Sequence, residues 1–424
     1  MSLFVLLCFP LFSSANAVTM WDGTYGGESN DTVESLIEMP DGGYLLAGTW
    51  TYNYSEDCLL IKTDPFGFLQ WNKTYGGTGK DSLGELNTTA DGGYIMAGRT
   101  TSYGVGDYDA WLVKFDALAQ ITWNKTYGGP DNDYIASFTE TSDGGYALAG
   151  AWNLTTYNDL ADGLAFQSLH GDFWLVKTTA SGYMLWNKTY GGTGDDAALS
   201  LVATSDGGYA LAGYTNSYGA GQSDFWLVKT NADGNVEWSK TYGGAGSEMA
   251  FRLVVTPDGG YSMAGVTNSF GAGDLDFWLV KTDSMGNMQW SKTYGGTDSD
   301  TAHSLIVTSD DGYAIAGQTR SFGAGGFDFW LIKTDGYGNA EWNKTYGGTA
   351  DDTVPTLIAT SDGGYALAGS TWSLGVGGDI WLIKTNMFGI YPEYTSLLTP
   401  AIVLTATAFI IISKKRLLPK HAQT

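Results

Sequence analysis

Two sets of acidic residues recur at fixed positions and are the side chains best suited to chemistry. The first set lies seven residues after the threonine of each Thr-Tyr-Gly-Gly motif, at Asp31, Asp81, Asp133, Asp196, Glu248, Asp300 and Asp352. The second set opens a later apolar segment of each repeat, at Asp57, Asp109, Asp172, Asp224, Asp276, Asp328 and Asp379. Carboxylate oxygens around a concave mouth suit Ca²⁺, so the first set is the candidate metal site. The alternative is that each acid accepts backbone N–H bonds, which their presence in every repeat favours.

Departures from the repeat matter because a catalytic site breaks symmetry. The third repeat is eleven residues longer than its neighbours, with the insertion inside residues 153–170. This segment is the candidate ligand-contacting element, and the alternative is a tolerated surface insertion. Arg99, Arg252, His303 and Arg320 are interpreted as local packing or pairing choices. The sequence contains no HExxH, CxxC or phosphate-binding loop. A pair of catalytic carboxylates of the glycosidase type is not excluded, because acidic residues are frequent.

The elements that must position these residues are short strands. Thr-Tyr-Gly-Gly begins at Thr24, Thr74, Thr126, Thr189, Thr241, Thr293 and Thr345, with a usual period of 52. One repeat contains four segments of the type Phe-Arg-Leu-Val-Val, Tyr-Ser-Met-Ala-Gly-Val-Thr, Asp-Phe-Trp-Leu-Val-Lys-Thr and Met-Gln-Trp-Ser-Lys-Thr-Tyr. Each is rich in β-branched and aromatic residues, and Asp-Gly-Gly or Gly-Asn turns separate them.

Seven repeats of four antiparallel strands predict an all-β, seven-bladed β-propeller. The last repeat lacks its fourth strand, and one such strand stands alone at the start, around Trp21–Tyr25. We expect this N-terminal strand to complete the last blade and close the ring, which removes an exposed sheet edge. The predicted propeller covers residues 18–394.

The repeat resembles a family of secreted and surface proteins of archaea and bacteria. The resemblance rests on WxKTYGG, TSDGGYALAGxT and DFWLVKTDxxGN, which together recur over nearly all of residues 21–385. It implies an extracellular β-propeller and supplies no reaction.

The two ends of the chain predict export and anchoring. Residues 1–17 combine a short apolar run with small residues at Ala15 and Ala17, as a signal peptide does. Residues 395–413 form an apolar run long enough for a single transmembrane helix. Lys414, Lys415 and Arg416 follow at once, so residues 414–424 are expected to be a basic cytoplasmic tail. The C-terminal stretch also resembles the membrane anchors of archaeal surface proteins.

The charge of the chain indicates which classes of partner it can bind, and its cysteine content indicates how it is stabilised. The chain carries a formal charge of −24 with 45 acidic residues, and four of its 21 basic residues lie in the C-terminal tail. This balance argues against nucleic acid and against anionic membrane surfaces as partners. Cys58 is the one cysteine outside the expected signal peptide, so an internal disulfide is excluded and stability must come from packing.

Eight Asn-x-Ser/Thr sequons make a glycoprotein the expected form of an exported chain. They lie at Asn30, Asn53, Asn72, Asn87, Asn124, Asn153, Asn187 and Asn343. The alternative at the four Asn-Lys-Thr sites is a small polar strand residue, since serine occupies the same place at Ser239 and Ser291. Lysines in the third segment of every repeat are expected to pair with acids or to cover aromatic faces.

The sequence therefore favours an extracellular, membrane-anchored module for binding, adhesion or envelope structure. Envelope glycans or surface proteins are its expected partners, and Ca²⁺ is the candidate cofactor. The alternative is a surface polysaccharide hydrolase or lyase with its site at the acidic mouth of the propeller.

Overall fold

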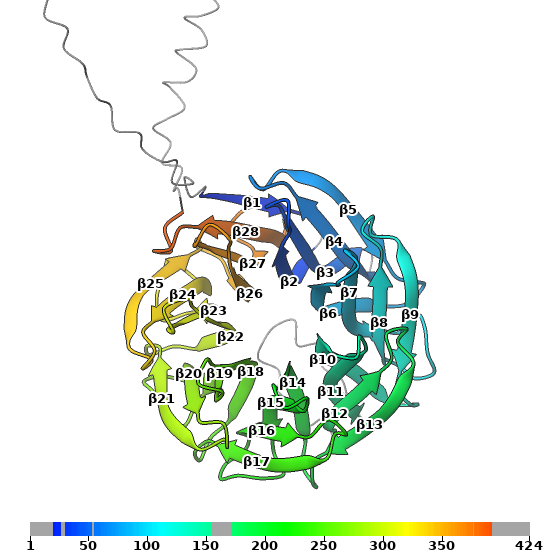
Figure 1. Cartoon of the computed structure of the whole chain (residues 1–424). Helices are drawn as coiled ribbons and strands as arrows, with labels where there is room; N and C mark the ends of the chain where they lie inside the picture. Colours follow the sequence, from blue (N-terminus) through cyan, green and yellow to red (C-terminus); the bar gives the residue numbers. More distant parts are fainter. Residues whose placement is uncertain (1–19, 27–29, 53–54, 155–170, 376, 392–424) are drawn as a thin grey trace, which may run out of the picture. The chain divides into compact units, whose positions relative to one another are not determined.

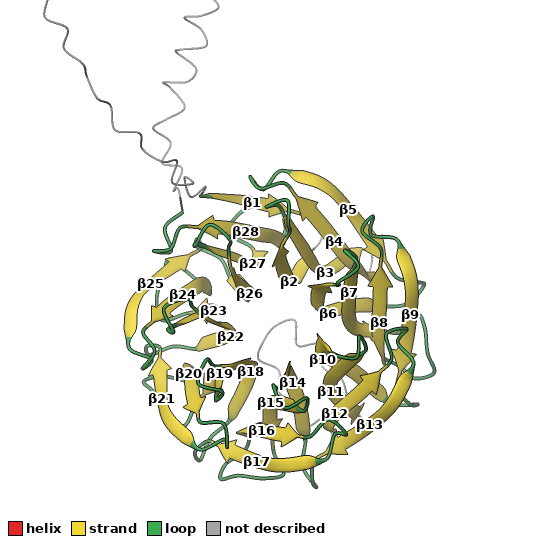
Figure 2. Cartoon of the chain, in the orientation of Figure 1, coloured by secondary structure: helices red, strands yellow, loops and turns green. Residues whose placement is uncertain are grey.

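The computed structural model describes residues 20–26, 30–52, 55–154, 171–375 and 377–391. They form a ring of seven antiparallel sheets, each of four strands, around a central channel (Figure 1). Figure 2 shows strands joined by turns and loops throughout the described part of the chain. The prediction of an all-β, seven-bladed propeller is confirmed. The expected signal peptide, transmembrane helix and cytoplasmic tail lie outside the described residues, and within those residues no helix is long and apolar enough to cross a membrane.

The strands follow the four segments of each repeat in order. Blade 1 contains β2 (Thr32–Glu38), β3 (Tyr44–Tyr52), β4 (Ser55–Thr63) and β5 (Leu69–Tyr75). Blade 2 contains β6 (Asp81–Thr88), β7 (Tyr94–Thr100), β8 (Asp109–Phe115) and β9 (Ile121–Tyr127). Blade 3 contains β10 (Asn132–Glu140), β11 (Tyr146–Leu154), β12 (Asp172–Thr178) and β13 (Met184–Tyr190). Blade 4 contains β14 (Asp196–Ala203), β15 (Tyr209–Thr215), β16 (Asp224–Thr230) and β17 (Val236–Tyr242).

The remaining blades repeat the pattern. Blade 5 contains β18 (Glu248–Val255), β19 (Tyr261–Thr267), β20 (Asp276–Thr282) and β21 (Met288–Tyr294). Blade 6 contains β22 (Asp300–Val307), β23 (Tyr313–Thr319), β24 (Asp328–Thr334) and β25 (Ala340–Tyr346). Blade 7 contains β26 (Asp352–Ala359), β27 (Tyr365–Thr371), β28 (Asp379–Thr385) and β1 (Trp21–Tyr25). The first strand of each blade lies at the channel and the fourth at the periphery (Figure 1).

The N-terminal strand closes the ring. β1 pairs antiparallel with β28, with Trp21 opposite Lys384 and Tyr25 opposite Ile380. Trp21 is 7% exposed, packs in one core cluster with Leu59 and Leu382, and donates from its indole nitrogen to the carbonyl of Pro65 at 2.9 Å. The predicted closure is therefore confirmed, and it removes the sheet edge that the last three strands would otherwise expose.

The core lies between neighbouring sheets. The second and third strands are buried on both faces, as in β15, β16, β19 and β20. Aromatic rings link consecutive blades, with Phe225 of blade 4 lying 4.6 Å from Trp278 of blade 5 between ring centroids. Cys58 is buried within this core, and burial raises the pKa of its thiol.

Because strand direction alternates, connections fall on two faces. We call the loop face the one that carries the connections from the fourth strand to the next blade and from the second strand to the third. The turn face carries the tight turns from the first strand to the second and from the third strand to the fourth. The acidic residues at the starts of first and third strands therefore belong to the loop face.

Candidate functional site

The seven ring acids named as metal candidates are built into the blade junctions. Each is at most 1% exposed and lies at or next to the start of a first strand. In blade 2, Asp81 accepts from the Gly77 amide at 2.8 Å and from the hydroxyls of Ser102 and Thr100. Five more repeat the amide contact from the second glycine of the motif, at Asp133, Asp196, Glu248, Asp300 and Asp352. These bonds fix two loops at once.

The second acid set meets the first set across each junction. The first glycine of the motif lies between one acid of each kind, because a Cβ at Gly295 would overlap Asp276 and come within 2.7 Å of Asp300. Similar close approaches occur at Gly26, Gly76, Gly128, Gly191, Gly243 and Gly347. The structure thus brings the acids together in pairs, one pair per junction, rather than in one cluster.

The acids of the third strands are held in their loops by backbone amides. Asp276 accepts from Ala272 at 2.8 Å, and Asp224 accepts from Ala220 at the same distance. Burial raises the pKa of the carboxyls of Asp57, Asp172, Asp224, Asp276 and Asp328, and the neighbouring ring acid adds to the effect. Among the described residues, no three or more His, Cys, Asp and Glu side chains are grouped as a metal site requires. Calcium binding by the ring acids stays a prediction.

The repeated lysines confirm the expectation of acid pairing. Each third-strand lysine contacts the aspartate of the Asp-Gly turn in its own blade, and its side chain is between 2% and 12% exposed. The pairs are Lys62–Asp41, Lys114–Asp91, Lys177–Asp143, Lys229–Asp206, Lys281–Asp258, Lys333–Asp310 and Lys384–Asp362. In blade 5, burial acts to raise the pKa of the Asp258 carboxyl, but hydrogen bonds from Lys281 and Thr256 lower it to about 2. These lysines belong to the framework of every blade.

The channel wall is where the blades differ most. The first strand of each of blades 1 to 6 carries a β-bulge that leaves one residue out of register. In blades 1 to 6 that residue is Glu34, Gly84, Ala136, Leu199, Phe251 and His303 respectively. A bulge re-aims a side chain away from the regular ladder, and bulges cluster next to functional sites.

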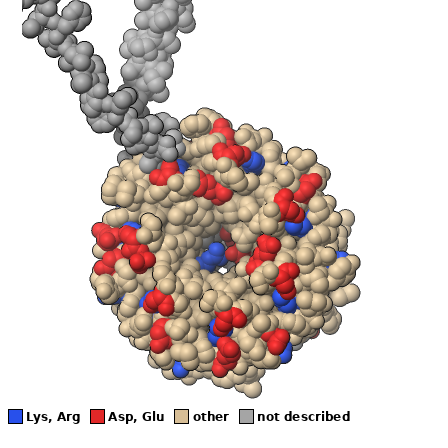
Figure 3. All heavy atoms as spheres, viewed as in Figure 1, with Lys and Arg blue, Asp and Glu red and all other residues tan. Residues whose placement is uncertain are grey.

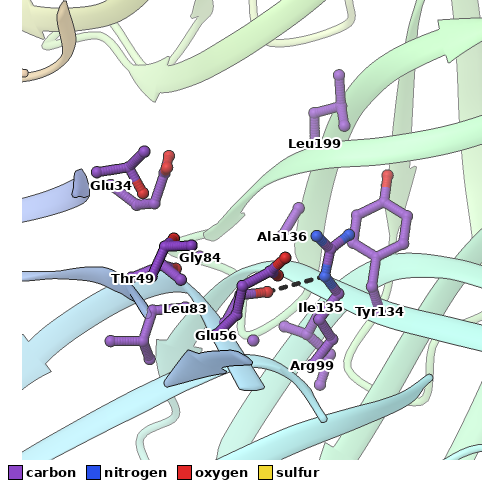
Figure 4. A pocket seen from close by; sticks show the side chains of 14 residues that line it. Glu34, Thr49, Glu56, Leu83, Gly84, Arg99, Tyr134, Ile135, Ala136 and Leu199 are labelled. Atoms are coloured by element: carbon purple, nitrogen blue, oxygen red, sulfur yellow. Dashed lines mark hydrogen bonds between the residues drawn. The ribbon is translucent and has the colours of Figure 1, made fainter. Parts of the chain in front are cut away.

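Four of these bulged residues line a cavity of about 320 Å³ on the loop-face side of the channel. Glu34 comes from β2, Glu56 from β4, Arg99 from β7 and Tyr134 from β10, and Figure 4 shows them around the same opening. The cavity is also lined by three residues with hydroxyl groups, Thr32, Thr51 and Ser82. We call this cavity the mouth pocket.

The charged groups of the mouth pocket are held in place. Arg99 donates from Nε to the hydroxyl of Ser82 at 2.8 Å, and its guanidinium carbon lies 4.9 Å from the ring centre of Tyr108. Glu56 forms an ion pair with Lys80. Burial raises the pKa of the Tyr134 hydroxyl, and the nearby Arg99 charge opposes that rise. The pocket therefore offers two carboxylates, one guanidinium and several hydroxyls, and neighbouring side chains hold Arg99 and Glu56 in place.

These polar residues are absent from the equivalent positions of other blades. The place of Glu34 is taken by Gly84, Ala136, Leu199, Phe251, His303 and Pro355, and the place of Arg99 by Thr49, Ala151, Tyr214, Val266, Gln318 and Ser370. From the sequence, Arg99 is interpreted as a local packing or pairing choice, and Glu34, Glu56 and Tyr134 do not stand out as candidates. The signal was present as four departures from the repeat.

A second departure spans the channel. Glu85 of β6 pairs with Arg252 of β18 at 3.3 Å, although these strands belong to blades 2 and 5. Glu85 also accepts from the backbone amide of Phe138 at 2.8 Å. In blades 1, 3, 4 and 6 a serine makes the corresponding bond to the next blade. Figure 3 shows basic and acidic atoms inside the central opening.

The other residues named from the sequence either make packing or pairing contacts or lie outside the described residues. The His303 ring lies 5.2 Å from that of Phe251, and burial lowers the pKa of its imidazole to about 4. The guanidinium carbon of Arg320 lies 4.1 Å from the centre of the Phe327 ring, and its Nη2 lies 3.8 Å from Oδ1 of Asp351. Of the blade 3 insertion, residues 155–170 lie outside the described residues.

Four sequons lie at the periphery of the ring. Asn72, Asn124, Asn187 and Asn343 are exposed on fourth strands. Asn30 is exposed on the loop face, where its side-chain oxygen accepts from Gly378 at 3.2 Å, and Asn87 is half-buried on β6. Asn53 and the side chain of Asn153 lie outside the described residues. Glycosylation at all eight sites stays a prediction.

Comparison with known proteins gives distant similarity. No protein family model matches the chain. It is 25% identical over 311 residues to the regulatory protein FlaEY of Caulobacter vibrioides, a match that covers 62% of this chain and 31% of that protein. The chain thus spans about a third of the length of the curated relative it matches.

The chain is also similar to solved structures at low identity. Sqt1 from Chaetomium thermophilum has a TM-score of 0.46 at 14% identity, with 83% of each chain covered. The Pan2 WD40 domain of Neurospora crassa has a TM-score of 0.39 at 11% identity, covering 74% of this chain and 91% of that domain. At these values the likeness concerns the overall architecture alone and says nothing about a site.

Proposed function

We propose that this protein is a cell-surface propeller, exported and held by its C-terminal apolar segment, that binds an envelope glycan in the mouth pocket. The observation that carries the proposal is that Glu34, Glu56, Arg99 and Tyr134 converge on one cavity although each occurs at its position in one blade only. Repeated residues in this chain hold the ring together. Residues that break the repeat at one place are free to serve recognition.

The chemistry of the pocket suits a polyhydroxylated ligand. Carboxylates accept hydrogen bonds from sugar hydroxyls, the guanidinium donates to ring and hydroxyl oxygens, and the Tyr134 ring offers an apolar face. A few convergent polar groups fix the orientation of a ligand in a preformed concave site. A rigid ring positions them without a folding cost on binding.

The test is binding of the purified full-length chain, in detergent, to an array of immobilised polysaccharides. We expect a subset of glycans to be retained, and Arg99→Gln to lose most of that retention. Arg320→Gln is the matched control, because it removes the same charge from the same face outside the pocket. Equal retention by both variants, or none by the wild-type chain on any glycan, would contradict the proposal.

A second candidate function is cleavage of the bound polysaccharide by hydrolysis or elimination. It is favoured by the presence of two carboxylates, Glu34 and Glu56, in one pocket with a basic and a phenolic residue. Pairs of carboxylates are what glycoside hydrolysis requires. The two functions separate in one experiment, in which retained glycans are incubated with the chain and reducing ends are measured over time.

If cleavage occurs, Glu34→Gln and Glu56→Gln should each abolish the release of reducing ends while the glycan is still retained. If the glycan is retained and no ends are released, the protein binds without catalysis.

A further inference from the structure

The turns that follow the third strands carry exposed apolar side chains on most blades. Phe68, Leu118 and Tyr337 keep 72%, 74% and 75% of their surface exposed. Their counterparts include Phe66, Tyr183, Met285, Met387 and Phe388, each more than half exposed. We call these eight residues the apolar rim. They lie at the periphery of the turn face, opposite the mouth pocket.

Four exposed aromatics on the loop face pack against tryptophans, which distinguishes them from the rim. Tyr103, Tyr218, Phe270 and Phe322 each lie against the tryptophan of a third strand, with ring centroids between 5.1 and 5.5 Å apart. Their exposed fractions are between 42% and 48%. The rim residues sit at turn tips and keep more surface in water, and exposed apolar side chains gathered on one face are candidates for an interaction site.

Lysines accompany the apolar rim. Lys73 donates to the carbonyl of Leu118 at 2.6 Å, and the ammonium of Lys125 lies 4.2 Å from the centre of the Tyr183 ring. Lys188 and Lys292 reach the side chains of Asn235 and Asn339 on the following turns. Aromatic and aliphatic tips with lysine stems beside them occur at membrane–water interfaces, and the carboxylates of the same turns, at Asp64, Asp116, Asp283 and Asp335, bond to the backbone amides of their own turns.

The chain ends point to the same edge. β28 ends at Thr385, and the turn that follows contains Met387, Phe388 and Ile390. Five residues separate Ile390 from Ser396, where the apolar run begins, so the chain can extend at most about 20 Å between them. At the other end, Trp21 at the start of β1 bonds to Pro65, directly before Phe66. The rim is densest on blades 7 and 1, where both ends join the ring.

We propose that the apolar rim contacts the outer surface of the bilayer that holds the C-terminal segment, so that the mouth pocket faces away from the membrane. This inference rests on the anchoring in the proposed function. The contact is apolar and aromatic, because the acidic chain has no surplus of positive charge to attract anionic lipids. It therefore requires neither anionic headgroups nor low salt.

The test uses the full-length chain in nanodiscs of phosphatidylcholine that contain lipid spin-labelled near the headgroup. Cys8→Ser gives a background in which the remaining cysteine, Cys58, is buried and unreactive. A fluorophore is attached at Phe68→Cys on the rim or at Val105→Cys on the loop face, where Val105 is 81% exposed. We expect strong quenching and a blue shift at position 68, neither at position 105, and no change on adding salt.

The outcomes separate the two proposals. If the chain does not enter nanodiscs at all, anchoring fails, and the rim proposal fails with it. If the chain enters but position 68 is quenched no more than position 105, anchoring stands and the membrane contact is overturned. The same holds if position 68 forms cross-links between two copies instead. In the supporting case, Phe66→Ser with Phe388→Ser should reduce the quenching at position 68.

Discussion

The two faces of the ring use the same residue type in opposite electrostatic settings. On the turn face, seven aspartates each meet a buried lysine, and the pKa of Asp206, Asp258 and Asp310 falls to about 2. On the loop face, acids meet acids at each blade junction, and burial raises the pKa of Asp224, Asp276 and Asp328. On the turn face each repeated aspartate has a lysine as counter-charge within its own blade. On the loop face, carboxylates of like charge lie next to each other where the blades meet.

This difference shows that the structural role of a repeated acid depends on its neighbours and not on its residue type. The turn-face aspartate caps a tight turn and balances a buried ammonium. The loop-face pair holds two connections through backbone amides and hydroxyls, which lets buried carboxylates lie side by side without lysines. The mouth pocket opens on the loop face, where residues that occur in one blade only lie near the repeated acids.

The largest expected effect comes from removing one charge on each face of blade 5. Asp258→Asn keeps the shape of the turn but takes the counter-charge from Lys281, whose side chain is 7% exposed. We expect a loss of about 1.5 kcal/mol in the free energy of unfolding. Asp276→Asn should be neutral or stabilising at pH 7, because it relieves repulsion with Asp300. Denaturant unfolding of both variants measures the difference, and equal losses would remove the distinction between the faces.

Tyrosine hydroxyls sharpen the comparison with a smaller effect. The tyrosine of every Thr-Tyr-Gly-Gly motif donates to a carbonyl on the next blade's turn, as Tyr242 does to Gly286 at 2.6 Å. Tyr242→Phe should cost about 1 kcal/mol, because it leaves a buried carbonyl without its donor. On the loop face, Tyr218 also donates to a carbonyl, Gly191, but it is half exposed.

The chain itself supplies a control for the tyrosines. Phe270 and Phe322 occupy the place of Tyr218 in blades 5 and 6, whereas the motif tyrosine is present in all seven copies. Tyr218→Phe should therefore change the free energy of unfolding by at most about 0.3 kcal/mol, since water replaces the lost bond. A larger loss at Tyr218 than at Tyr242 would reverse the ranking of the two faces.

Acid should act on the faces in opposite directions. A carboxyl whose pKa is lowered on folding contributes stability above its unfolded value of 3.8, and this is lost as the pH falls through about 2. A carboxyl whose folded pKa is raised, such as Asp276, gains stability as the pH falls through that folded pKa. Melting temperatures between pH 2 and pH 7 measure the sum.

The two asparagine variants separate these contributions. Asp276→Asn should remove part of the stabilisation on mild acidification, and Asp258→Asn should remove part of the loss near pH 2. Identical pH profiles for the two variants would show that the faces titrate alike.

Most of the framework could be predicted from sequence because it is local and repeated. Turn residues and β-branched segments give the strands, seven copies give the blades, and the displaced strand at Trp21–Tyr25 gives the closure. The pairing of Lys281 with Asp258 was also predictable in kind. Each of these follows from residues that sit close together in one repeat or are required by ring closure.

The mouth pocket could not be predicted, because it depends on geometry that links blades. Glu34, Arg99 and Tyr134 belong to three blades, and a bulge in β2 decides where Glu34 points. The sequence shows only that each departs from the repeat. Likewise, Arg252 was interpreted as a local choice, but it reaches Glu85 on another part of the ring.

The cross-channel pair has a smaller expected effect than the blade 5 aspartates or Tyr242, and it joins two blades that are not neighbours. Arg252 is 39% exposed and Glu85 13%, so solvent screens their attraction, and we expect a coupling of about 0.5 kcal/mol. A double-mutant cycle of Glu85→Gln and Arg252→Gln measures it, since the amide oxygen introduced by Glu85→Gln can still accept from Phe138. The coupling should shrink as salt is raised, unlike the bond between Tyr242 and Gly286. A coupling of zero at low salt would mean that the two side chains do not brace the channel, and that the ring is held by neighbouring-blade contacts alone.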